Sequence, residues 1–212
     1  MFKSKAAAAA LIPLILAGCS QNGQLTDTGI IVTRSACPAV AIPASTGDVT
    51  LFNPESSRDA NAIDVVASIT NVRSTCDETG DNIVTNVSFE VQAQRRDTRG
   101  AREVVLPYFA TVLQGGTNVV SKSVSRVGLR FADGAARATA AGAATGRVAR
   151  AAVTLPEAIR RQVTRERKPG DADAAIDPFA DPAVREAVRR ASFEVLVGFQ
   201  LTEAQLAYNA TR

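Results

Sequence analysis

Two neighbouring stretches alternate apolar and polar side chains, and this pattern restricts the fold more than any other feature. In residues 83–95, one face is apolar and the other polar. The apolar set is Val87, Phe89, Val91 and Ala93, and the polar set is Asn86, Ser88, Glu90, Gln92 and Gln94. Residues 63–70 have the same period, and turn-forming residues separate the two stretches. A period of two is typical of a strand with one buried face, so the pair predicts a long antiparallel hairpin.

The rest of the chain predicts more strands and a few short helices. Strands are expected at residues 30–32, 48–53, 104–113, 119–131, 147–155 and 193–201, and helices after Pro156, after Asp181 and after Thr202. Pro107 predicts an edge or a bulge, and a change of apolar face predicts a bulge near Ser125. Residues 133–146 are rich in Ala, Gly and Thr and predict a mobile loop. The predicted fold is mainly β, an antiparallel β-sandwich of immunoglobulin-like or related type with short C-terminal helices.

Composition excludes several classes of chemistry. The chain of 212 residues has no histidine, which is the usual general base and the commonest transition-metal ligand. Triads that use histidine and His-ligated metals are therefore excluded, and no cofactor is expected. The 24 Lys and Arg residues exceed the 21 Asp and Glu residues by three. Loss of Lys3 and Lys5 with an export signal would reduce this excess to one, so charge gives no reason to expect nucleic acid as a partner.

The N-terminus has the pattern of an export signal. Lys3 and Lys5 precede an apolar run that is too short for a membrane span of about 20 residues. The run ends in Leu16-Ala17-Gly18-Cys19, which resembles the lipobox of bacterial lipoproteins. The resemblance implies cleavage after residue 18 and acylation of Cys19. Residue 20 is Ser rather than Asp, which by the same resemblance implies the periplasmic face of the outer membrane. The expected organisation is a signal at 1–18, a lipidated tether at 19–27 and one β-rich domain at 28–212.

Lipidation of Cys19 leaves Cys37 and Cys76 as an even pair. Disulfides persist in oxidising compartments, so we predict that these two cysteines are bonded. Thiol redox chemistry and metal ligation are the alternatives, but the pair has no CxxC spacing and no partner ligands in the sequence.

An acidic stretch near the C-terminus suggests calcium. Asp171, Asp173 and Asp177 could converge on a hard cation, but Ala175 and Ile176 occupy positions where an EF-hand has a ligand and a glycine. A solvated linker is the alternative.

Three functions are compatible with these residues. The favoured one is a non-enzymatic, lipid-anchored binding or assembly subunit of a cell-envelope complex, which contacts a protein partner through exposed strand edges or through arginine-rich loops such as residues 95–102. The second is an enzyme on cell-wall or glycan substrates that uses paired carboxylates, with Glu90 and Glu194 as candidates. The third is a calcium or small-ligand binding lipoprotein.

Overall fold

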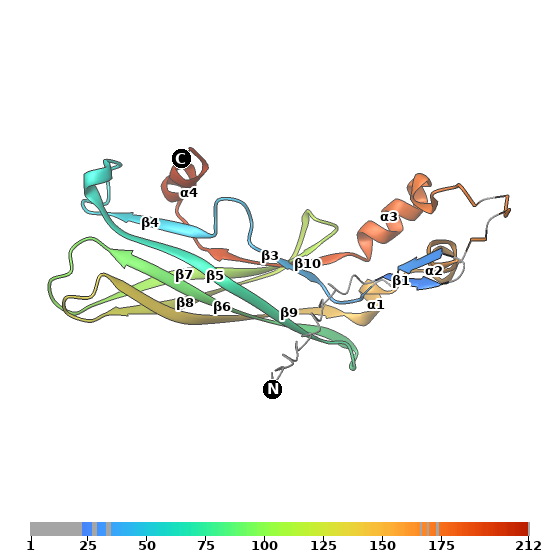
Figure 1. The fold of residues 1–212 in the computed structure, drawn as a ribbon, viewed down its shortest axis with the longest axis horizontal. Coiled ribbons are helices and arrows are strands. Elements are labelled where there is room, and N and C mark those ends of the chain that lie inside the picture. The colour runs from blue at the N-terminus through green and yellow to red at the C-terminus, as the bar shows by residue number, and fades with distance from the viewer. Residues whose placement is uncertain are drawn as a thin grey trace, which may run out of the picture.

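The computed structural model describes residues 23–26, 29–32, 35–165, 167–168, 170–172 and 174–211. Within them, eight strands form two four-stranded sheets (Figure 1). The first sheet has the order β3 (Ala39–Ala41), β10 (Phe193–Phe199), β7 (Arg102–Gln114) and β8 (Asn118–Phe131). The second has the order β4 (Asp48–Phe52), β5 (Ile63–Asp77), β6 (Asn82–Arg95) and β9 (Arg137–Ala149). A separate ribbon contains β1 (Gly23–Thr26) and β2 (Gly29–Val32).

The two sheets pack face to face, which confirms the predicted β-sandwich. Neighbouring strands are antiparallel except for β3 and β10, which are parallel. This four-plus-four order differs from the ABED and CFG sheets of an immunoglobulin domain. The fold is therefore a related sandwich.

The core forms where the inner faces of the sheets meet. Buried residues recur at every second position of β6, as the alternation predicts, and at Phe193, Val195, Val197 and Phe199 of β10. The Phe89 and Tyr108 rings meet edge to face between the sheets, with centroids 5.1 Å apart. Such contacts contribute about 0.5–1.5 kcal/mol beyond area burial.

The prediction of a mobile loop at residues 133–146 is wrong. Most of that stretch belongs to β9, which pairs with β6 from Arg137 opposite Gln94 to Ala149 opposite Asn82. Small residues suit this strand because large side chains from elsewhere in the sandwich cover it. A Cβ at Gly142 would overlap the buried Phe89 ring, and one at Gly146 would lie 2.5 Å from Val195. The small residues that predict a flexible loop are therefore required for close packing of β9 in the sandwich.

The bulge and the proline lie differently from expectation. The register of β7 and β8 shifts where Val112 faces Ser121 and Leu113 faces Val119, so the extra residue is Val120 rather than one near Ser125. Pro107 lies in an inner strand, but beyond the end of β10, where its carbonyl accepts the Gln200 N–H at 2.9 Å. The edge or bulge predicted from Pro107 is therefore wrong, because the proline lies between Arg126 of β8 and the chain that follows β10.

Short helices complete the fold. They are η1 (Ala60–Ala62), α1 (Arg150–Val153), α2 (Glu157–Thr164), η2 (Pro178–Ala180), α3 (Pro182–Arg190) and α4 (Glu203–Thr211). Asp181 caps α3 at the Ala183 N–H (2.8 Å), and Thr202 and Gln205 form the expected capping box. The strand expected at 147–155 ends at Ala149 instead. Figure 1 shows α1, α2 and α3 at one end of the molecule and α4 beside β4.

The predicted disulfide is present. Cys37 and Cys76 are bonded, with Cα atoms 6.1 Å apart. Cys37 precedes β3 of the first sheet, whereas Cys76 lies near the end of β5 in the second. The bond therefore links the two layers at the β5–β6 end of the sandwich.

Candidate functional site

The two candidate catalytic glutamates lie on opposite faces of the molecule. Phe89 and Val91 point into the core, so Glu90 between them faces outward from the second sheet. By the same alternation Glu194 faces outward from the first sheet. Packed sheets are about 10 Å apart, and both side chains point away from the gap. Glycosidase carboxylates are at most about 9.5 Å apart, so these two glutamates do not form a catalytic pair.

The acidic stretch does not assemble ligands in the described part of the chain. Asp171 accepts the Lys168 N–H at 3.1 Å and pairs with Arg165 at 3.5 Å. Asp177 caps η2 at the Phe179 N–H (2.9 Å). Asp173 lies outside the described residues. Among the residues that are described, the one group of three possible ligands within 4.8 Å is Cys37, Cys76 and Glu78, and its two sulfur atoms already form the disulfide.

Cys19, the predicted lipidation site, also lies outside the described residues. No helix in the described part of the chain is long and apolar enough to cross a membrane.

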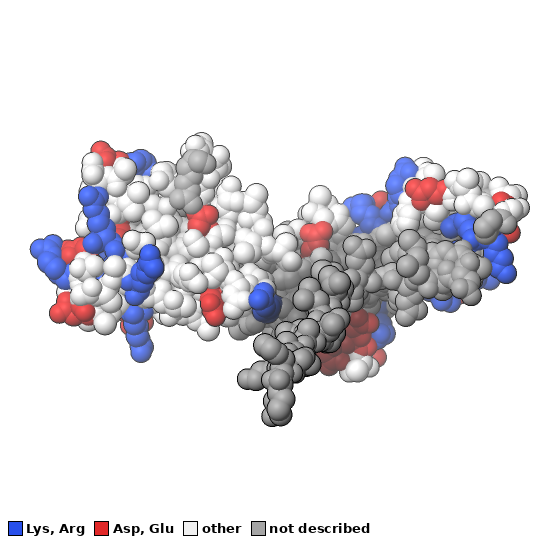
Figure 2. Space-filling model, viewed as in Figure 1, with Lys and Arg blue, Asp and Glu red and all other residues white. Residues whose placement is uncertain are grey.

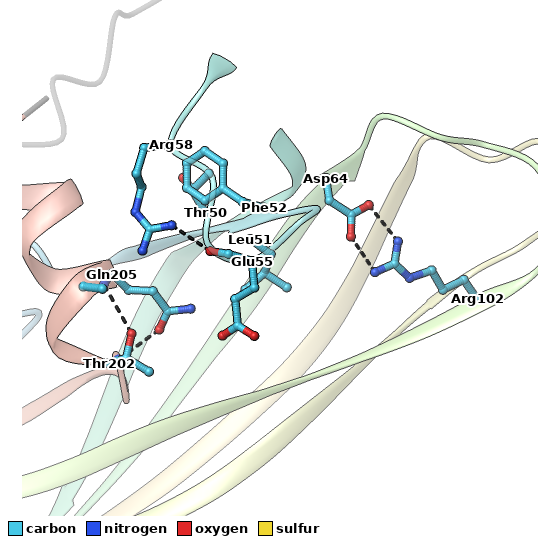
Figure 3. A pocket seen from close by; sticks show the side chains of 10 residues that line it. Thr50, Leu51, Phe52, Glu55, Arg58, Asp64, Arg102, Thr202 and Gln205 are labelled. Atoms are coloured by element: carbon cyan, nitrogen blue, oxygen red, sulfur yellow. Dashed lines mark hydrogen bonds and ion pairs between the residues drawn. The ribbon is translucent and has the colours of Figure 1, made fainter. Parts of the chain in front are cut away.

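A hollow of about 360 Å³ lies between β4, the start of β7 and the first residues of α4 (Figure 3). Its charged and polar groups largely bind one another. Arg102 donates to both carboxylate oxygens of Asp64 at 2.6 and 2.7 Å, which raises the pKa of Arg102. Arg58 lies over the Phe52 ring and donates to the Glu55 carbonyl at 2.8 Å. Both cations of the hollow are therefore already engaged within the fold.

The arginine-rich connection after β6 is also largely engaged within the fold. Arg99 pairs with Asp97 at 2.6 Å, and this hydrogen bond lowers the pKa of Asp97. Arg95, expected in an exposed loop, is only 2% exposed. Its guanidinium donates to carbonyls of two loops. The acceptors are Thr98, Gly100, Ala132 and Ala135, at 2.8 to 2.9 Å. Arg95 is therefore structural, whereas the Arg99 side chain remains 90% exposed beside Asp97.

The most unusual surface is the first part of β8. All nine residues from 118 to 126 are exposed, although they belong to a strand. In the described part of the chain β8 pairs only with β7, so its other edge is unpaired. The uncovered inner side has a structural cause, since β9 crosses away from β8. The Tyr108 hydroxyl of β7 donates to the Ala143 carbonyl at 2.7 Å, and Gly146 approaches Val112 of β7.

Exposed apolar side chains gather on this hairpin. Of the seven large apolar residues that the described chain exposes, four lie on β7 and β8: Val105, Val119, Val120 and Val124, each 49–58% exposed. Val124 lies opposite Phe109, and the Lys122 ammonium is 5.2 Å from the centre of the Phe109 ring. Concentrated exposed apolar area is typical of interaction surfaces.

The sequence contained a signal for this surface that was interpreted differently. Serines occupy positions 121, 123 and 125, where the alternation of Val127, Leu129 and Phe131 places the inner face. From the sequence, a bulge near Ser125 is predicted to explain why the apolar residues change from one face of the strand to the other. The register is in fact regular from Ser121 to Phe131, so valines on the outer face and serines on the inner face indicate an uncovered strand.

Comparison with protein families, curated proteins and solved structures finds no match. Function must therefore be inferred from this chain's own residues.

Proposed function

We propose that this protein is a lipid-anchored, non-enzymatic binding or assembly subunit of a cell-envelope complex, on the periplasmic face of the outer membrane. The single observation that most supports binding is the exposed stretch of β8, with an unpaired edge and three exposed valines. An unpaired strand edge is a template for another strand, and extended segments bind such edges through main-chain hydrogen bonds.

Other features fit a binding role better than catalysis. The hollow in Figure 3 holds ion pairs and hydrogen bonds among its own residues. On the face seen in Figure 2, charged side chains gather at the left end of the molecule, and the described surface next to them is mostly white with a few isolated charges. A sandwich with one unpaired strand edge and exposed valines along it is suited to contact with protein.

The anchor rests on the lipobox resemblance at residues 16–19. We expect the mature protein, extracted in mild detergent, to begin at Cys19 and to carry acyl chains, because two or more chains give stable membrane attachment. Intact-mass spectrometry measures this directly. The variant Cys19→Ser should lack the added mass, whereas a Cys37→Ser/Cys76→Ser variant should retain it. A mature chain that begins elsewhere and has no acyl mass would contradict the anchor.

The binding edge is tested by making β8 polar without changing its charge. We expect Val119→Asn/Val124→Asn to reduce the co-purifying partner at least about tenfold, since anchors at the centre of an interface typically contribute 1 kcal/mol or more each. The measurement is detergent extraction of native membranes, sizing and quantitative mass spectrometry. Ile176→Asn is the matched control, because Ile176 is equally exposed (58%) but lies outside the sandwich. An unchanged complex in the β8 variant, with folding retained, would rule out this edge.

A further inference from the structure

The β8–β9 region has a charge distribution unlike the rest of the chain. Between residues 118 and 149 there are five cations and one carboxylate, Asp133. The cations are Lys122, Arg126, Arg130, Arg137 and Arg147. The whole chain has an excess of only three positive charges. The unpaired edges of both sheets on this side of the sandwich are therefore strongly basic.

Three of these cations form a row along β8. Lys122, Arg126 and Arg130 are four residues apart and lie on the outer face, opposite Thr111, Pro107 and Glu103 of β7. At about 3.4 Å per residue the spacing is about 14 Å. Only Arg130 faces a carboxylate, that of Glu103 at 3.7 Å, and both side chains are well exposed. An ion pair of this kind contributes little stability, so the row is available to a partner.

The inner side of the same strand has room for bulky side chains. Ser121, Ser123 and Ser125 are exposed there, and the half-buried inner residues Ala140 and Ala144 of β9 are also small. A strand added beside β8 would place alternate side chains on each face. One set would meet the cation row, and the other would lie over these small residues, where apolar groups could be covered.

We propose that β8 receives an extended acidic segment of a partner protein, with carboxylates at every fourth position opposite Lys122, Arg126 and Arg130 and apolar side chains on the alternate face. This inference rests on the proposed function and specifies its partner. Charge also disfavours a second copy of this chain as the occupant when the cation rows of the two copies are aligned. An antiparallel β8 pair centred on Arg126 would place Arg126 opposite its own copy and Lys122 opposite Arg130. Like charges directly opposite one another are destabilising.

The test uses the full-length protein in mild detergent and a nine-residue synthetic peptide. The peptide has glutamate at positions 1, 5 and 9, threonine at 3 and 7, and isoleucine at the even positions, so that it matches β8 in either direction. We expect saturable binding by fluorescence anisotropy that weakens as salt is raised. Slower hydrogen exchange should accompany it at residues 118–131.

Matched peptides and variants separate the possible outcomes. Replacing glutamate by lysine should abolish binding, and scrambling the order should weaken it. Lys122→Glu/Arg126→Glu/Arg130→Glu should weaken binding of the acidic peptide about tenfold or more, because each of three cross-strand pairs changes sign. Arg185→Glu/Arg189→Glu on α3 controls for general charge.

Three results would overturn the acidic-segment proposal. They are equal binding of the scrambled peptide, no protection of β8, or binding of the row to phosphatidylglycerol vesicles in place of the peptide. The native complex then distinguishes this failure from failure of the proposed function. A complex lost in Val119→Asn/Val124→Asn but retained in the charge-reversed variant would keep the binding edge and reject the acidic segment. A complex retained in both would reject the edge itself.

Discussion

Arg95→Met should lower the melting temperature by about 10 °C, although Arg95 lies in a stretch whose sequence resembles an exposed loop. The side chain is 2% exposed and lies 5.2 Å from the centre of the buried Phe131 ring. It also supplies hydrogen bonds to carbonyls in the loops that follow β6 and β8. Hydrogen bonds from charged groups contribute about 1.5–3 kcal/mol each, but their contributions are not additive. A total loss of about 3–5 kcal/mol is expected, and each kcal/mol shifts the melting temperature by about 2–4 °C at this size.

Two variants control this measurement, which is thermal unfolding followed by circular dichroism. Arg137→Met removes an exposed arginine near by and should shift the melting temperature by no more than about 2 °C. Arg95→Lys should recover part of the stability, because one ammonium cannot reach all four carbonyls. If the melting temperature of Arg95→Met equals that of Arg137→Met, the Arg95 guanidinium does not hold the two loops together.

Loss of the Cys37–Cys76 disulfide should lower the free energy of unfolding by about 4 kcal/mol. The bond joins residues that are 39 positions apart in the sequence. For a closed loop of that length, the chain-entropy model gives a stabilisation of about 4 kcal/mol. Guanidinium unfolding of the Cys37→Ser/Cys76→Ser variant measures the difference in free energy of unfolding. The midpoint should fall, and so should that of the wild type in reductant.

The double variant is also the control for the reductant itself, since it has no disulfide to lose and should unfold identically with and without reductant. A wild-type midpoint that is unchanged by full reduction would contradict the expected stabilisation. The bond would then serve only to position β3 against the end of β5.

Much of the sandwich could be predicted because alternation reports burial directly. The β5–β6 hairpin and the capping box at Thr202 follow from local patterns in the sequence, and the disulfide follows from the even pair of cysteines left after Cys19. Features that depend on contacts between residues far apart in the sequence could not be predicted in this way. β9 looked flexible because its small residues make sense only beneath Phe89 and Val195. Arg95 looked exposed because its acceptors lie on loops up to 40 residues away.

The sequence predicts that some exposed strand edge contacts a partner, but it does not predict which strand provides that edge. Exposed strand edges were expected, but which strand is bare depends on the path of β9 across the sandwich. The serines of β8 indicated that path only in combination with the regular register of β7 and β8. The two glutamates of the enzyme hypothesis show that a plausible residue pair in the sequence need not be a pair in space. Glu90 and Glu194 face outward from different sheets.

The position of β10 between β3 and β7 affects how this chain can be made. β3 has no other strand neighbour in its sheet, and β10 lies more than 150 residues further along the chain. Until β10 has left the ribosome, the sheet lacks its second strand, with Val195, Val197 and Phe199 absent from the core. Contacts so distant in sequence slow folding. Under the export proposed above, that delay would keep the chain unfolded until it had crossed the membrane.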